Sequence, residues 1–114
     1  MYEEIEMLAK RARAASVRLA QTSDDERNGA LRAMAQALRE SAPAVLKANA
    51  VDVAAAREKG TKESLIDRLL LTDARIEDMA VALESLAELP NPLGRTLEQR
   101  TLESGIRLER VSVP

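Results

Sequence analysis

Few residues in this chain have the types and spacing that catalysis requires. The 114 residues include no histidine and no cysteine, which excludes disulfides, thiolate and imidazole metal ligands, a cysteine nucleophile and an imidazole base. Carboxylate pairs such as Asp24–Asp25 and Asp73–Glu77 lie in the expected first turns of helices. Capping explains acidic residues at those positions. The residues alone therefore predict no catalytic residue.

The glycines do not form a phosphate-binding motif. They stand alone at positions 29, 60, 94 and 105, and this spacing matches neither the dinucleotide fingerprint GxGxxG nor a P-loop. We predict that this chain contains no cofactor-binding residue and no metal-binding residue.

The basic residues form one cluster, made of Lys10, Arg11, Arg13 and Arg18. An anion-binding patch is one interpretation, but a solvated helix face partly paired with its own glutamates is favoured. Seventeen basic against nineteen acidic residues leave a net charge of -2, so the chain lacks the positive field that attracts nucleic acid. A helix-based nucleic-acid binder is therefore disfavoured. Its affinity would fall steeply with salt.

Asn49 and Asp52 are polar residues three positions apart in an alanine-rich segment. Side chains of this kind can hold a neighbouring loop through hydrogen bonds. Simple exposure to solvent explains them equally well, and the sequence leaves both interpretations open.

Helical periodicity dominates the first ninety residues. The spacing of apolar residues predicts helices over about 2–21 and 24–40. Ser23, with Glu26 three positions later, forms a capping box in front of the second. Pro43 is expected to end that helix and to start another, because only the first turn of a helix can spare the missing N–H.

The helix that follows Pro43 is expected to run to Gly60, which suits a left-handed C-terminal cap. The residues expected to face inward there are Val45, Leu46, Ala50 and Val53. The segment ESLIDRLLL predicts a short turn or helix, and Thr72 is expected to cap the last helix.

That last helix carries the cleanest apolar stripe, and LPNPLGR ends it. The stripe consists of Ile76, Met79, Ala80, Leu83, Leu86 and Ala87. We interpret the methionine and leucine stripes as core. With 46% apolar residues, a packed core is plausible, and alanine and leucine must supply it.

Beyond Gly94 the spacing of apolar residues changes from the helical period to the alternation of a β-strand. We predict a hairpin whose two strands cover 96–103 and 106–113 and whose turn contains Gly105 with a positive φ. We also expect a bulge near Arg110. An isolated two-stranded ribbon is marginal in water. We therefore expect the chain to be truncated and its partner sheet to lie outside it.

The chain shows no targeting or membrane segment. Its acidic start, MYEEIEM, lacks the basic region of a secretory signal, and no run approaches the roughly 18 apolar residues of a membrane span. A cytoplasmic location is expected, with neither a membrane nor a nucleic acid as partner.

Four blocks carry a family resemblance: LKANAVDVAAAREKG, IDRLLLTDARIEDMA, LPNPLG and SGIRLERVSVP. In this order they are similar to the N-terminal part of the glutamate-5-semialdehyde dehydrogenases, also called γ-glutamyl phosphate reductases, over essentially the whole chain. Two loop positions depart from the family: Asn91, where aspartate is more usual, and Leu93, where valine is common.

The resemblance implies a fold and a division of the chain. The fold would be mainly α, with about five helices followed by a C-terminal β-hairpin, as the N-terminal part of an α/β aldehyde dehydrogenase-like fold. Residues 1–90 would pack on the nucleotide-binding domain, and residues 91–114 would form a linker and the hairpin of the oligomerisation or bridging sheet. The nucleotide-binding core and catalytic domain would be missing.

The resemblance also implies an activity. The family uses NADPH to reduce L-glutamyl 5-phosphate to L-glutamate 5-semialdehyde in proline biosynthesis, through a thioester on a catalytic cysteine. No catalytic residue of the family matches a position here, so the fragment is expected to be inactive and to bind no NADPH. Its expected partners are the remainder of its own chain and further copies, through the hairpin.

A stand-alone helical protein-interaction module is the alternative function. Such a module would have to bury its apolar stripes within 114 residues and should unfold cooperatively and reversibly.

Overall fold

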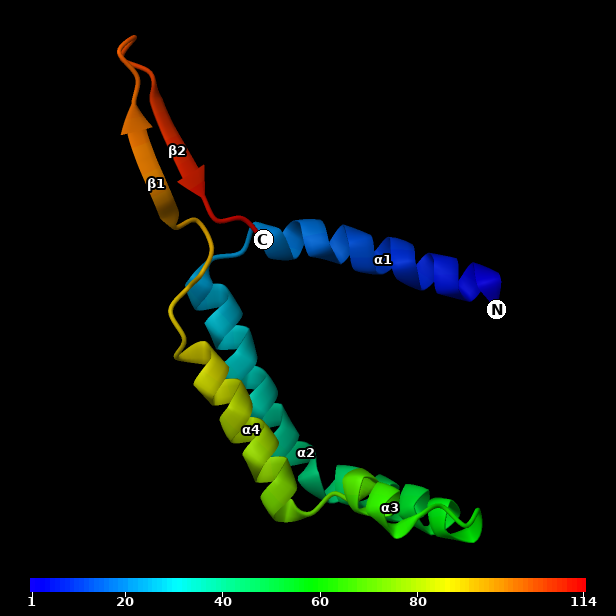
Figure 1. The fold of residues 1–114 in the computed structure, drawn as a ribbon. Coiled ribbons are helices and arrows are strands. Elements are labelled where there is room, and N and C mark those ends of the chain that lie inside the picture. The colour runs from blue at the N-terminus through cyan, green and yellow to red at the C-terminus, as the bar shows by residue number, and fades with distance from the viewer. The chain divides into compact units, whose positions relative to one another are not determined.

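The computed structural model describes all residues from 1 to 114 and contains four helices and one hairpin (Figure 1). The elements in chain order are α1 (Tyr2–Ala20), α2 (Asp24–Glu58), α3 (Glu63–Leu69), α4 (Asp73–Ala87), β1 (Thr96–Thr101) and β2 (Arg107–Val111). The predicted fold class, mainly helical with a C-terminal hairpin, is confirmed. Two compact units form: the helical unit, Asp25–Leu89, and the terminal unit, Met1–Asp24 with Pro90–Pro114.

Helix α2 continues through Pro43, so the predicted helix end at residue 40 and the count of five helices are wrong. Proline removes the N–H that would donate to the carbonyl of Arg39. A long helix accommodates this loss by bending, and α2 changes direction part-way along (Figure 1). Packing on both sides of the proline outweighs one lost backbone hydrogen bond.

The predicted helix boundaries are otherwise close. Gly60 adopts φ 74°, its N–H donates to the Arg57 carbonyl (3.0 Å), and the Thr61 N–H donates to the Ala56 carbonyl (3.1 Å). This pair of bonds is a Schellman motif, which closes α2. The Thr72 hydroxyl accepts a backbone N–H of the first turn of α4 (3.2 Å), which confirms that cap.

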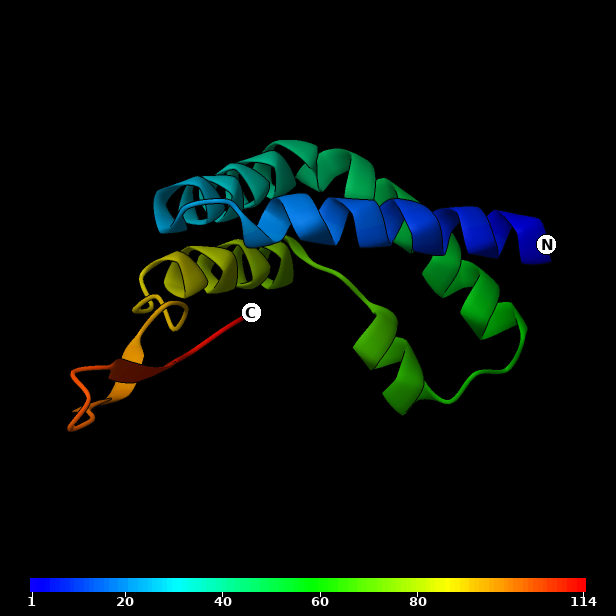
Figure 2. The same ribbon diagram turned by 90° about the horizontal axis from the view of Figure 1, so that it is seen from above.

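The core lies in the helical unit, where α4 runs along the first half of α2 and α3 along its second half (Figures 1 and 2). The buried apolar residues are Ala35, Val53, Ile66, Ile76, Ala80 and Ala87. Val45 and Leu46 are half-buried, whereas Ala50 is exposed, contrary to prediction. The second half of α2 has only the short α3 beside it, so a narrower part of its surface is covered.

Several residues interpreted as core are exposed. Met34, Met79 and Leu86 each leave about half of their surface in contact with solvent, and α1 buries no residue at all. The interpretation of the methionine and leucine stripes as core is therefore wrong for these residues. Two packed helices cover only part of a stripe as wide as the one on α4.

The hairpin has the predicted turn and the predicted irregularity. Gly105 has φ 86°, and the turn is closed by the Leu102 N–H donating to the Ile106 carbonyl (2.8 Å). The register shifts opposite Arg110, where Leu97 is the extra residue on β1. Every strand residue is exposed. The strands are shorter than predicted, because the turn takes up residues 102–106.

None of the helices is both long and apolar enough to cross a membrane.

Candidate functional site

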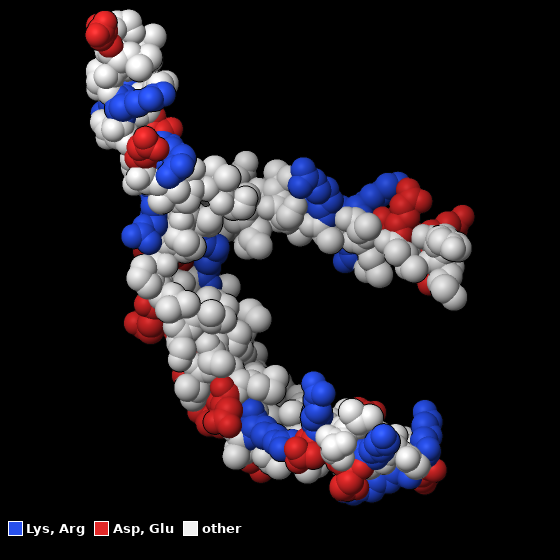
Figure 3. Space-filling model, in the orientation of Figure 1, with Lys and Arg blue, Asp and Glu red and all other residues white.

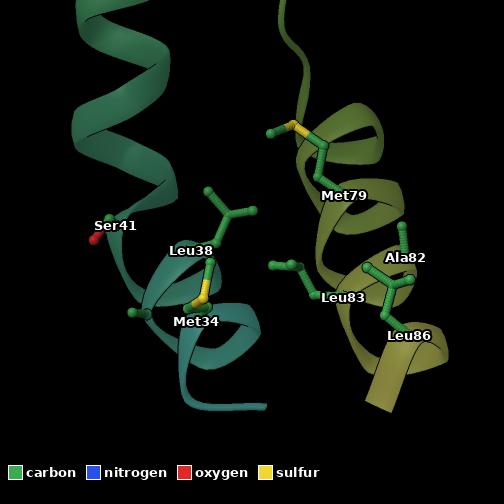
Figure 4. A pocket seen from close by; sticks show the side chains of 8 residues that line it. Met34, Leu38, Ser41, Met79, Ala82, Leu83 and Leu86 are labelled. Atoms are coloured by element: carbon green, nitrogen blue, oxygen red, sulfur yellow. The ribbon is translucent and has the colours of Figure 1, made fainter. Parts of the chain in front are cut away.

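The helical unit has an apolar groove between α2 and α4, with a volume of about 680 Å³. Its lining residues are Met34, Ala37, Leu38 and Ser41 from α2, with Met79, Ala82, Leu83 and Leu86 from α4. Figure 4 shows Leu38 and Leu83 extending into the space between the two helices. We call this surface the α2/α4 groove.

The α2/α4 groove contains no titratable side chain, and Ser41 is its only residue with a polar side chain. The face in Figure 3 shows mainly uncharged atoms along these two helices, whereas charged atoms gather where α2 runs beside α3. Such a surface binds apolar side chains. It offers no acid–base group, and its only side-chain donor is the single hydroxyl of Ser41. It therefore suits packing rather than catalysis.

Arg39 clamps α2 to α4. Its guanidinium donates to both carboxylate oxygens of Glu77 (2.8 and 2.9 Å) and of Glu84 (2.6 and 3.0 Å). Hydrogen bonds from Arg39 lower the pKa of Glu77 and of Glu84 below the ordinary glutamate value, and the same bonds raise the pKa of Arg39. A second α2–α4 pair joins Arg32 to Glu88 at 2.7 Å.

We expect Arg39→Gln to weaken the pH dependence of unfolding of the helical unit. A carboxyl whose pKa is depressed in the folded state contributes stability above its ordinary pKa of about 4.3, and this is lost as pH falls through the depressed value. Urea unfolding from about pH 7 down to about pH 2 measures this loss. The control is Lys47→Gln, which removes an exposed cation from the same helix. If acid lowered the free energy of unfolding of Arg39→Gln and Lys47→Gln equally, Arg39 would not be the cause of the lowered pKa values of Glu77 and Glu84.

Asn49 anchors the connection between α3 and α4. Its side-chain amide donates to the Leu69 carbonyl (2.9 Å), and its oxygen accepts the backbone N–H of Leu71 (2.8 Å). Arg75 supports the same connection by donating to the carbonyls of Asp67 and Leu70. The loop-holding interpretation of Asn49 is confirmed, whereas Asp52 is exposed.

The other candidate residues do not come together in a site. Asp73 opens α4 as expected, but Glu77 binds Arg39, so capping does not account for this residue. Lys10 pairs with Glu6 at 2.6 Å, as expected for a solvated helix face. No group of three or more acidic residues that could hold a metal ion is present.

Sequence reasoning missed the Arg39 clamp and the α2/α4 groove. Glu77 and Glu84 are seven residues apart and so lie on one face of α4, which was a usable signal for a shared cation. The groove residues were recognised as apolar stripes. Their exposure depends on how many helices cover them, and periodicity carries no information on that number.

Comparison with known proteins finds sequence relatives of one name, gamma-glutamyl phosphate reductase. No family model matches the chain. The chain is 50% identical over 110 residues to the gamma-glutamyl phosphate reductase of Erythrobacter litoralis, covering 96% of this chain and 26% of the relative. It is 45% identical over 111 residues to the enzyme of that name from Thermobifida fusca, covering 97% and 27%. The chain thus spans about a quarter of the length of these relatives.

Solved structures agree with the sequence comparison. The crystal structure of gamma-glutamyl phosphate reductase from Thermotoga maritima matches with a TM-score of 0.91 at 42% identity, over 93% of this chain and 26% of that one. The Saccharomyces cerevisiae structure of the same name gives 0.87 at 35%, over 95% and 28%. The resemblance noted in the sequence, including its restriction to an N-terminal part, is confirmed.

Proposed function

We propose that this chain, a part of the gamma-glutamyl phosphate reductase family in sequence and fold, is the N-terminal portion of an NADPH-dependent enzyme that reduces L-glutamyl 5-phosphate to L-glutamate 5-semialdehyde. This reaction serves proline biosynthesis, and we assign it to the cytoplasm. The supporting observation is that sequence and fold agree with the relatives over more than nine tenths of the chain.

The residues present do not fit the cofactor or the chemistry. A dinucleotide needs several donors for its phosphates, and the α2/α4 groove supplies only the hydroxyl of Ser41 and no basic residue. In the proposed reaction a cysteine thiolate attacks the acyl carbon, phosphate leaves, and the resulting thioester is reduced to the aldehyde. This chain has no cysteine. We therefore place both the nucleophile and the NADPH site in the remainder of the reductase.

The proposed role of the chain is that of a scaffold. The helical segment 1–90 packs on the nucleotide-binding domain, and exposed apolar side chains such as Val51 and Leu65 are available for this contact. The hairpin joins a sheet that links subunits, because both of its strands have one unpaired edge and an open edge is a template for a further strand.

A chimera tests this function. The matching 110-residue segment of the Erythrobacter litoralis relative is replaced by this chain, and NADP⁺ reduction is followed with glutamate semialdehyde and phosphate, the reverse of the proposed reaction. We expect the chimera to retain activity, whereas the relative without the segment and the 114-residue chain alone should be inactive.

Circular dichroism and gel filtration establish that the chimera is folded before its activity is judged. A folded but inactive chimera would contradict the scaffold role. NADPH-dependent turnover by the 114-residue chain alone would contradict the assignment of the nucleophile to the remainder of the enzyme.

A further inference from the structure

The base of the hairpin is partly shielded from solvent, unlike its strands. Within residues 90–114 only Asn91, Leu93 and Ser112 are half-buried, and all the others are exposed. Ser112 follows β2, and the other two belong to the linker 91–95, which leads into β1. A two-stranded ribbon is marginal in water by itself. The contacts at the base are therefore the ones that can order this hairpin.

Ser112 is the residue on which the linker converges. Its hydroxyl donates to the Pro92 carbonyl (2.5 Å) and accepts the Arg95 N–H (3.0 Å). Its backbone N–H donates to the Arg95 carbonyl (3.0 Å), and its carbonyl accepts the Gly94 N–H (2.9 Å). Four hydrogen bonds thus join one residue at the end of β2 to three residues of the linker. We call this arrangement the Ser112 clasp.

The linker is shaped for the Ser112 clasp by its own residues. Gly94 has φ 68°, a left-handed conformation that suits glycine, and its N–H and the next one along the chain both donate to atoms of Ser112. The Asn91 side-chain oxygen accepts the Leu93 N–H (3.0 Å), which forms an Asx turn. Pro92 lies inside this turn and has a fixed φ. Because the unfolded linker is already restricted, less conformational entropy is lost when the clasp forms.

The Ser112 clasp also continues the pairing of the two strands beyond the bulge. The last pair of the ladder joins Thr96 to Val111, and the register shift at Leu97 separates this pair from the others. The next pair outward is Arg95 with Ser112, whose backbone bond extends the ladder. Without the clasp, a single pair would hold the hairpin together beyond the bulge.

We propose that the Ser112 hydroxyl is a positioning group, which makes the linker and the hairpin one rigid body and so presents an ordered hairpin to a strand of a partner subunit. This inference rests on the proposed role of the hairpin in linking subunits. Strand addition uses main-chain hydrogen bonds along an edge, and these need the edge to be ordered. A segment that is ordered before it binds loses less conformational entropy on association.

Amide hydrogen exchange in the 114-residue chain tests whether the clasp acts as a unit. Ser112→Ala removes the hydroxyl and leaves the backbone groups in place. We expect exchange to accelerate about two- to tenfold, as for one lost hydrogen bond, both at Arg95 and at Gly94, whose own acceptor is the backbone carbonyl that alanine retains. Acceleration at Arg95 alone would reveal only a local bond and would overturn the proposal, as would unchanged exchange at both amides.

Ser112→Thr and Ser104→Ala are the matched variants for this measurement. Threonine keeps the hydroxyl and suits an extended backbone, so both exchange rates should stay near those of the unchanged chain. Ser104 is exposed in the turn of the same hairpin, so its truncation should alter neither rate. Exchange in Ser112→Thr as fast as in Ser112→Ala would mean that the hydroxyl does not position the linker, and the proposal would be wrong.

Light scattering on a dilution series of the chimera tests the consequence for assembly. Chimera subunits with Ser112→Ala should dissociate at a concentration about two- to tenfold higher than those with Ser112→Thr. Equal dissociation of the two would overturn this inference and leave the proposed function standing. A folded but inactive chimera without either substitution would instead contradict the proposed function, and the exchange rates would still decide whether Ser112 positions the linker.

Discussion

Ile76→Ala is expected to lower the free energy of unfolding of the helical unit by about 2 to 5 kcal/mol, the range for truncating a large buried aliphatic side chain. Ile76 is 2% exposed and is one of only two large side chains that are fully buried. The substitution removes apolar contacts and leaves a cavity that the neighbouring helices fill only in part. Urea or thermal unfolding followed by circular dichroism measures the change.

Val81→Ala provides the matched control for Ile76→Ala. Val81 lies on the same helix, is also β-branched and is 46% exposed, so its truncation should change stability by less than about 0.5 kcal/mol. If the two variants unfolded at the same urea concentration, Ile76 would not belong to the core that the structure describes.

Asn49→Ala is expected to lower the same free energy by about 1 to 3 kcal/mol, the cost of leaving buried polar groups without partners. Asn49 is 8% exposed and is the only buried polar residue. Its loss leaves the Leu69 carbonyl and the Leu71 N–H without the bonds that fix the α3–α4 connection. Amide hydrogen exchange at Leu71 should therefore accelerate along with the loss of stability.

Asp52→Ala is the control for Asn49→Ala, because Asp52 is exposed and lies on the same helix. For Asp52→Ala, the free energy of unfolding and the amide exchange rate at Leu71 should remain near those of the unchanged chain. Unaltered exchange at Leu71 in Asn49→Ala would show that the amide does not hold the loop.

Local signals in the sequence predicted the ends of elements well. Thr72, Gly60 and Gly105 mark a helix start, a helix end and a turn through chemistry confined to a few residues. The slip in alternation before Val111 predicted the bulge in the hairpin for the same reason. Such features depend on the backbone of the segment itself and scarcely on the rest of the fold.

Pro43 shows where local reasoning fails. A proline in the interior of a helix costs about 3 kcal/mol, which predicts a break between two helices. In the structure α4 and α3 lie beside the two halves of α2 (Figures 1 and 2), and their packing makes continuation favourable. This compensation comes from tertiary contacts, so the residues next to Pro43 in the sequence do not reveal it.

The candidate site was predictable only in part. Asn49 was recognised as a residue able to hold a loop, but its burial depends on the approach of α3, which the spacing of residues does not define. The Arg39 clamp joins positions 38 and 45 residues apart in sequence. The resemblance to the gamma-glutamyl phosphate reductases, by contrast, was visible in the sequence, because it uses the order of four whole blocks rather than any single contact.

The bulge at Leu97 affects how a partner would recognise the hairpin. Before the register shift, Leu108 shares a face with Arg110 and Glu98, while Arg107 and Glu109 occupy the other face, so neither side is mainly apolar. Beyond the shift, Val111 lies on the opposite side of β2 from Leu108. Strand addition would then rely on main-chain hydrogen bonds along an edge. Affinity for an added strand should therefore depend on backbone geometry far more than on side-chain identity.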